Sequence, residues 1–274
     1  MDSQDTSCLS LSYCTIVNCH FYSQIPWNFI SQSSESSTSL VIMTKTVLFV
    51  VSSAKTSPWG KDTGYWLEEV ASPYNLLVDA GFNVEIASIA GGSPPLDIGS
   101  TAESFVTEDT ARFVADAVAS QKMANTKPIS DYVERAKSGE FAAVFLPGGH
   151  GAALDFQPSA DLKSVIESCY SKNGVIAAVC HGCAGLMTPM DTVKGEHLVK
   201  GKKITGFSDV EETQVGLIGV VPFSIEAEFK KLGALYQQAD AWHPLVCVDN
   251  RVITGQNPQS SKEVGQELVK ILSA

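Results

Sequence analysis

Residues 174–186 read Gly-Val-Ile-Ala-Ala-Val-Cys-His-Gly-Cys-Ala-Gly-Leu. The apolar run Val175–Val179 predicts a buried strand, and Cys180 stands at its end with His181 and Gly182 directly behind it. A strand that turns sharply into a helix can hold its turn residue on strained dihedrals, with the side chain exposed above the sheet, if small neighbours let the backbones approach. The stretch therefore predicts a nucleophile elbow that presents the Cys180 thiol.

Two interpretations of Cys180 compete. A free cysteine is among the most buried residue types, so a cysteine at a strand end can be inert core. A thiol at a helix N-terminus would instead have its pKa lowered by the helix dipole and would act as a nucleophile. The adjacent His181 and the small residues on both sides favour the nucleophile. Because neighbouring side chains generally diverge at such a turn, we expect His181 to act on a substrate more than on the sulfur.

The rest of the chain alternates strands with helices. Continuous apolar strands separated by amphipathic helices indicate a mostly parallel sheet covered on both faces, with ligands bound at the carboxyl ends of the strands. Cys180 and the segment Pro147–Gly151, Pro-Gly-Gly-His-Gly, both follow strand ends. The pattern predicts strands at 46–51, 83–88, 142–146, 175–179 and 203–206, and helices at about 64–80, 107–119, 129–138, 159–172, 209 onward and 223–232.

The C-terminal region predicts a hairpin and a last helix. Asp249 and Asn250 separate two short apolar runs, and such residues tolerate the positive φ of a tight turn. Ser260 and Glu263 have the spacing of a capping box for a helix that runs to about Leu272.

Composition excludes some partners. The chain has 274 residues and a net charge of −11, with no basic stripe, which argues against binding nucleic acid or an anionic membrane. No apolar run approaches the roughly 18 residues that a membrane helix requires. Seven irregularly spaced cysteines do not form a secreted disulfide framework, so we expect a reducing, cytoplasmic compartment.

Residues 1–42 differ from the remainder. They contain no Lys or Arg and include Ser-Gln-Ser-Ser-Glu-Ser-Ser-Thr-Ser at 31–39, a pattern of neither a secretory signal nor a transit peptide. Met43 stands just before the first predicted strand. We interpret 1–42 as a disordered extension, or as the product of an upstream start codon, with a cryptic targeting role as the alternative. Residues 43–274 are predicted to form a single α/β domain.

A cysteine nucleophile needs groups that hold developing negative charge. Gly148 and Gly149 allow backbone N–H groups to converge on an anion, and with the amide of His181 or Cys180 they would form an oxyanion hole. The alternative is a simple tight turn. His150, inside the same segment, is expected to be structural.

Carboxylates occur in two places that could serve the thiol. Glu68 and Glu69 open the first long helix, where an acid packed against apolar residues would have a raised pKa and could donate to the thiolate. Asp209, Glu211 and Glu212 follow a later strand and could orient His181. For each of them, the alternative is an acidic helix start favoured by the helix dipole.

These motifs together resemble the ThiJ/PfpI family of the class I glutamine-amidotransferase-like superfamily. Ala-Ala-Val-Cys-His-Gly after Pro-Gly-Gly-His-Gly, Gly-Tyr-Trp-Leu-Glu-Glu-Val-Ala-Ser-Pro at 64–73 and Thr-Gly-Gln-Asn-Pro-Gln-Ser-Ser at 254–261 carry the resemblance, which covers residues 45–274. Within the family, the chain looks most similar to the glutathione-independent glyoxalase III branch, which also includes heat-inducible chaperones.

The resemblance implies a flavodoxin-like three-layer sandwich with a small cap, usually a homodimer, and no organic cofactor. It implies Cys180 as the nucleophile, His181 as the imidazole and Glu69 as the acid that contacts the cysteine. Glu212 matches the acid behind the histidine best, with Glu211 as the alternative.

The implied reaction converts a small 2-oxoaldehyde, methylglyoxal, to lactate. The thiolate would form a hemithioacetal held by the amides of Gly149 and His181, and His181 or Glu69 would move the C1 proton through an enediol to a thioester. The alternatives are a holdase chaperone, a protein deglycase or another activity of the superfamily, and a redox sensor in which Cys183 completes a C-x-x-C pair with Cys180. No metal site is expected, because the histidines show no ligand spacing.

Overall fold

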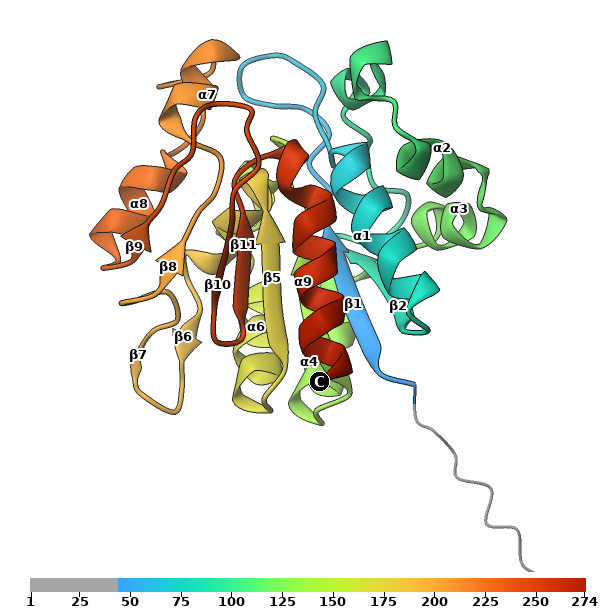
Figure 1. Cartoon of the computed structure of the whole chain (residues 1–274), viewed down its shortest axis with the longest axis vertical. Coiled ribbons are helices and arrows are strands. Elements are labelled where there is room, and N and C mark those ends of the chain that lie inside the picture. Colours follow the sequence, from blue (N-terminus) through green and yellow to red (C-terminus); the bar gives the residue numbers. More distant parts are fainter. Residues whose placement is uncertain (1–43) are drawn as a thin grey trace, which may run out of the picture. The chain divides into compact units, whose positions relative to one another are not determined.

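The computed structural model describes residues 44–274, so the interpretation of residues 1–42 lies outside the described residues. A seven-stranded sheet has the order β10-β11-β5-β4-β1-β2-β3, and every neighbouring pair is parallel except β10 and β11 (Figure 1). The prediction of a mostly parallel sheet is therefore confirmed. Its strands are β1 (Thr46–Val51), β2 (Asn83–Ser88), β3 (Lys127–Pro128), β4 (Phe141–Leu146), β5 (Val175–Val179), β10 (Val246–Asp249) and β11 (Val252–Gly255).

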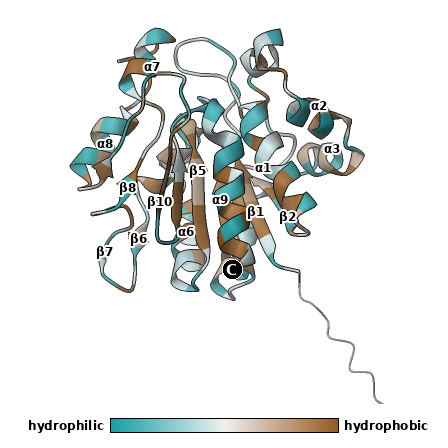
Figure 2. Ribbon diagram, viewed as in Figure 1, coloured by the Kyte–Doolittle hydropathy of each residue, from teal (hydrophilic) through white to brown (hydrophobic). Residues whose placement is uncertain are grey.

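Helices cover both faces of the sheet, which gives the three layers of a flavodoxin-like sandwich (Figure 1). On one face α1 (Leu67–Asp79) packs against α9 (Ser261–Ser273), and on the other α4 (Val133–Lys137) packs against α6 (Ala160–Ser171). The central strands are largely hydrophobic, whereas the outward side of α9 is mostly hydrophilic (Figure 2). This distribution is that of strands buried on both faces. Within the described part of the chain, none of the helices combines the length and the apolar character needed to span a membrane.

Shorter elements surround the sheet. The remaining helices are α2 (Glu108–Ala115), α3 (Ala117–Ala124), α5 (Ala152–Asp155), α7 (Asp209–Gln214) and α8 (Ile225–Lys231). The strands β6 (Met190–Asp191) and β7 (Glu196–His197) pair with each other, as do β8 (Lys203–Ile204) and β9 (Leu235–Tyr236). The predicted hairpin of β10 and β11 forms, and Asn250 in its turn has a φ of 54°.

Three local predictions outside the elbow were wrong in detail. The single helix expected at 107–119 is two helices, because the Asp116 side chain accepts hydrogen bonds from the N–H groups of Val118 and Ala119 and so starts α3. The helix expected at 129–138 begins as a 3₁₀ turn over Ile129–Tyr132 before α4.

The third correction concerns the start of the last helix. Ser260 and Glu263 do not form a capping box. The Ser260 hydroxyl instead donates to Asn257 Oδ1 at 2.9 Å and accepts from the N–H of Leu245 at 3.1 Å. The local pattern predicted that the Ser260 oxygen caps the helix, but this oxygen accepts the tertiary hydrogen bond from Leu245 instead.

The chain turns sharply where β5 ends. Cys180 has a φ of 57°, a left-handed conformation that is uncommon for a residue with a side chain. The helix expected after this turn forms as a 3₁₀ helix over Cys180–Leu186. A Cβ at Gly182 would lie 2.1 Å from the carbonyl oxygen of Leu146, at the end of β4. The elbow therefore depends on glycine at this position.

A pair of glycine substitutions tests the packing at this sheet edge. Gly149 has a φ of 91°, and a Cβ there would lie 2.3 Å from the carbonyl oxygen of Gly64, so we expect Gly149→Ala to lower the free energy of unfolding by about 3 kcal/mol or more. Gly60 has a φ of 77°, but a Cβ there would have no atom within 4 Å. Gly60→Ala should cost only about 1 kcal/mol. Urea unfolding of both variants checks this, and equal losses would contradict it.

Candidate active site

Cys180 lies at the base of a cavity of about 220 Å³ at the carboxyl ends of the central strands. The side chain of Cys180 is only 4% exposed, and the cavity walls are mostly aromatic, formed by Trp66, Phe105, Phe207 and Trp242. His150 and His181 also line it. The site is thus a small apolar chamber that holds one thiol and two imidazoles.

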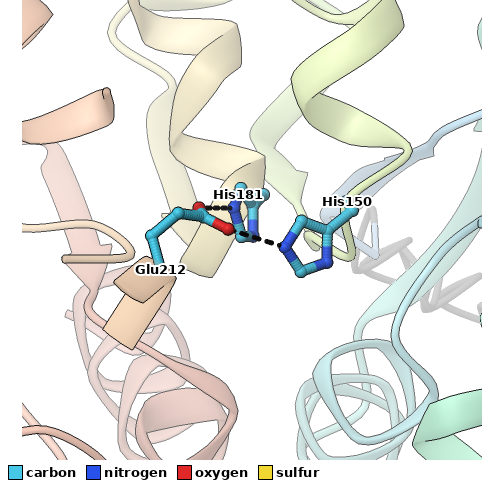
Figure 3. Close-up of side chains that lie close together, drawn as sticks. All are labelled: His150, His181 and Glu212. Atoms are coloured by element: carbon cyan, nitrogen blue, oxygen red, sulfur yellow. Dashed lines mark hydrogen bonds and ion pairs between the residues drawn. The ribbon is translucent and has the colours of Figure 1, made fainter. Parts of the chain in front are cut away.

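His181 contacts the thiol directly. Its Nδ1 lies 3.4 Å from Cys180 Sγ. Its Nε2 lies 2.7 Å from Glu212 Oε2 (Figure 3). The expectation that the two neighbouring side chains diverge was therefore wrong. The left-handed dihedral of Cys180 and the tight 3₁₀ turn behind it bring sulfur and imidazole to the same side of the chain.

Glu212 determines which nitrogen of His181 carries the proton. Burial raises the pKa of Glu212, but the hydrogen bonds from His150 and His181 outweigh burial and lower the pKa to about 2. The ionised carboxylate can only accept hydrogen bonds, so His181 donates from Nε2–H. Burial and the neighbouring His150 lower the pKa of His181, so the ring is neutral at pH 7. Its Nδ1 therefore presents a lone pair to the thiol, as a general base must.

His150 is a site residue that sequence reasoning assigned to structure. Its Nε2 lies 3.0 Å from Glu212 Oε1, and its ring centroid lies 4.1 Å from that of His181 (Figure 3). The ligand atoms of His150, His181 and Glu212 lie within 4.8 Å of one another, so these side chains could in principle hold a metal ion. In the described structure each Nε2 already bonds a different carboxylate oxygen. The sequence does contain one signal that His150 belongs to the site, because His150, like Cys180, follows the end of a predicted strand.

Glu69 is fully buried beside the thiol. The N–H of Gly148 donates to Glu69 Oε2 at 2.6 Å, and Oε1 is buried without a hydrogen-bond partner in the described structure. Burial raises the pKa of Glu69 to about 8, although the nearby Cys180 thiol and the Gly148 N–H act to lower it. Glu69 is therefore largely a neutral acid at pH 7. Of the two glycines expected to bind an anion, Gly148 already uses its N–H on Glu69, whereas Gly149 lines the cavity.

The pKa of the Cys180 thiol is raised, contrary to the expected effect of a helix N-terminus. Burial is the largest cause, and the neighbouring Glu69 raises the pKa further. The amide of His181 acts in the opposite direction but does not outweigh them. The resting site therefore holds a thiol, and any reaction at the sulfur would first need a base to remove its proton.

Glu211, next to Glu212 in the chain, belongs to a different hydrogen-bond network. It is fully buried, and its hydrogen bonds go to residues other than His181. Its Oε2 accepts from the N–H and hydroxyl of Ser208 at 3.0 and 2.7 Å, and its Oε1 accepts from the Trp242 N–H at 2.9 Å and Asn257 Nδ2 at 2.8 Å. Glu211 thus ties α7 to the segment 254–261, while Asp209 accepts from the Ser224 hydroxyl.

Cys183 is also a buried side chain rather than a surface thiol. It has no exposed area, its Sγ lies 3.9 Å from the carbonyl oxygen of Gly255, and burial raises its pKa well above the ordinary value. Both cysteines of the C-x-x-C spacing are free thiols. The geometry places Cys183 in the core beneath the elbow.

Comparisons with known proteins place the chain in a family and identify relatives. The sequence profile of the DJ-1/PfpI family matches residues 63–271. The chain is 31% identical over 218 residues to glyoxalase 3 of Candida albicans, covering 77% of this chain and 90% of the relative. It is 31% identical over 209 residues to the glutathione-independent glyoxalase HSP31 of Saccharomyces cerevisiae, covering 74% and 86%.

A solved structure supports the same grouping. The crystal structure of glyoxalase III from Candida albicans superposes with a TM-score of 0.74 and 28% sequence identity. The match covers 82% of this chain and 96% of that structure.

The adjacent glutamates Glu211 and Glu212 provide a matched pair of substitutions. We expect Glu211→Gln to lower the free energy of unfolding by about 2–4 kcal/mol, because an amide N–H₂ would face donors that cannot reverse. Glu212→Gln should cost only about 1 kcal/mol, because an imidazole partner can change tautomer and accept from the new amide. Urea unfolding at pH 7 compares them, and a larger loss for Glu212→Gln would contradict the assignment.

Glu69 should make stability depend on pH in an unusual direction. Its folded-state pKa of about 8 lies above the ordinary value near 4.5, so between these values the folded protein keeps a proton that the unfolded chain loses. This group therefore destabilises the wild type as pH rises through that window, by at most about 1.4 kcal/mol per pH unit. Glu69→Gln lacks this titration and should gain stability relative to wild type from pH 4.5 to 8. Unfolding free energies at several pH values test it; a constant difference would refute the raised pKa.

Proposed function

This chain belongs to the DJ-1/PfpI family, and from that premise we propose that it is a glutathione-independent glyoxalase that converts methylglyoxal and water to lactate. The relatives named above as glyoxalases support the proposal. The observation that carries it is the free lone pair of His181 Nδ1 at 3.4 Å from the Cys180 sulfur. That arrangement supplies an activated nucleophile inside the chamber, which is what addition to an aldehyde requires.

The first step is addition of the thiol to the aldehyde. His181 Nδ1 takes the proton of Cys180 as the sulfur bonds to C1 of methylglyoxal, and the proton then passes to the former aldehyde oxygen. The product is a hemithioacetal. The amides of Gly149 and His181 are the donors we assign to that oxygen, since the amide of Gly148 is engaged by Glu69.

The second step moves a hydrogen from C1 to C2. His181 removes the C1 proton while neutral Glu69 donates its proton to the C2 ketone oxygen, which gives an enediol. His181 then returns its proton to C2, and Glu69 recovers a proton from the hydroxyl on C1. The result is the thioester of lactate, and no external oxidant or reductant is needed. A carboxylic acid that stays protonated near pH 7 is suited to this role.

The third step is hydrolysis. Water activated by His181 attacks the thioester carbonyl, the C–S bond breaks, and the thiol of Cys180 regains a proton. Glu212 holds the imidazole in one tautomer through the cycle and stabilises its protonated form. The homodimer and the cytoplasmic location implied earlier stay predictions.

Lactate formation from methylglyoxal without glutathione tests the proposal. We expect turnover by the wild type and its loss, by about 10³-fold or more, in Cys180→Ala, because this variant lacks the thiol that forms the hemithioacetal in the cavity. Glu69→Gln should also lose turnover, because an amide cannot exchange the proton on the ketone oxygen.

Cys183→Ala is the matched control, a second buried cysteine close behind Cys180 in the chain. It should retain turnover. If the wild type forms no lactate, the glyoxalase proposal fails. If Cys183→Ala alters thiol oxidation while Cys180→Ala leaves turnover intact, the redox alternative is supported instead.

A further inference from the structure

The cavity extends well beyond the thiol and is apolar where it does so. Its volume of about 220 Å³ compares with roughly 30 Å³ for one water molecule in the liquid. Cys180, His150 and His181 line it, and the other side chains that line it are aromatic or aliphatic. Methylglyoxal has a single methyl group beside its two carbonyls, so it leaves most of this apolar wall uncontacted.

Two aromatic pairs shape the space. Trp66 and Phe105 meet edge to face with centroids 5.0 Å apart, and Phe207 and Trp242 meet with centroids 5.8 Å apart. The centroid of the Phe207 ring is also 4.5 Å from that of the His181 ring, so the aromatic surface is continuous from His181 to Trp242. A flat ring next to the reacting carbonyls could make offset or edge-to-face contacts with these walls.

The backbone of Trp242 is strained. Its φ is 64°, and a bulky side chain in this region is an outlier. The N–H of His243 bonds to the carbonyl oxygen of Asp240, so Trp242 is the third residue of a tight turn. Glycine is the residue that such a turn accepts without strain when φ is positive. The geometry of the turn favours glycine at position 242 and therefore does not explain why a tryptophan occupies it.

Two side chains hold Trp242 in this conformation. Its backbone N–H donates to Glu211 Oε1 at 2.9 Å, and its indole Nε1–H donates to Gln214 Oε1 at 2.5 Å. Glu211 is fully buried and has no part in the proposed reaction. Strained residues persist only where the surroundings over-determine them, and they gather at ligand sites. The buried acid and the strained turn together fix an indole as a wall of the cavity.

We propose that the site is built for 2-oxoaldehydes that carry a flat apolar group, with phenylglyoxal as the test compound, and that Trp242 determines this preference. The inference rests on the proposed glyoxalase function and narrows its substrate class. Phenylglyoxal has the same aldehyde beside a ketone, so the same steps apply: the thiol adds to the aldehyde, the C1 proton moves to C2, and water releases mandelate.

The experiment compares kcat/KM for phenylglyoxal, measured as mandelate, with kcat/KM for methylglyoxal, measured as lactate. In the wild type we expect the phenylglyoxal value to be higher by about tenfold or more. Trp242→Gly should lower it by about tenfold or more and should lower the methylglyoxal value less, so that the preference for phenylglyoxal falls. Glycine adopts the positive φ freely, so this variant removes the wall and keeps the turn.

Trp242→Phe is the matched control, because it keeps a ring on the same backbone, and its loss on phenylglyoxal should be smaller than that of Trp242→Gly. Thermal unfolding of both variants checks the fold, and Cys180→Ala gives the uncatalysed background. A wild type that prefers methylglyoxal, or a Trp242→Gly variant that loses both substrates equally, would overturn the inference but leave the proposed function standing. Turnover of neither substrate by the wild type would sink both.

Discussion

The left-handed backbone of Cys180 is the constraint on which the site depends. It turns the chain out of β5 so that the next residue, His181, falls beside the sulfur instead of away from it. The turn is possible because the chain at Gly182 passes against the end of β4, closer than any side chain allows. Strain at one residue is thus balanced by the packing of two central strands whose residues are almost all buried.

Two buried glutamates show how environment divides one residue type into two roles. Glu69 has a single backbone donor and an oxygen without a partner, so burial dominates and keeps the acid neutral. Glu212 is also largely buried, yet two imidazoles donate to it and keep it ionised. The first can exchange a proton and the second can hold a charge. This contrast follows from hydrogen-bond donors rather than from depth alone.

Glu211 connects the site to the rest of the molecule. Its oxygens gather donors from the start of α7, from the turn at Trp242 and from the segment that precedes α9. The same helix therefore positions Glu212 behind His181 and anchors the indole wall of the cavity. Neighbouring residues on one short helix serve the chemistry and the shape of the chamber separately.

The resemblance to a known family and the expected flavodoxin-like sheet are both confirmed. Both predictions rested on short stretches of sequence. Hydrophobic runs, helix periodicity and the small residues around Cys180 specify strands, helices and the elbow, because each depends on neighbours within a few residues. One detail failed where a distant group competed with a local one, because the Ser260 hydroxyl accepts from the N–H of Leu245 instead of capping its own helix.

The site shows the same division. Its location at the strand ends could be read from Cys180 and the Pro-Gly-Gly-His-Gly segment. Only the tertiary structure decided that Glu212 rather than Glu211 meets His181, that His150 shares that acid, and that burial raises the pKa of the thiol. These outcomes depend on distances and desolvation among residues far apart in the chain, which only the assembled sheet and its helices determine.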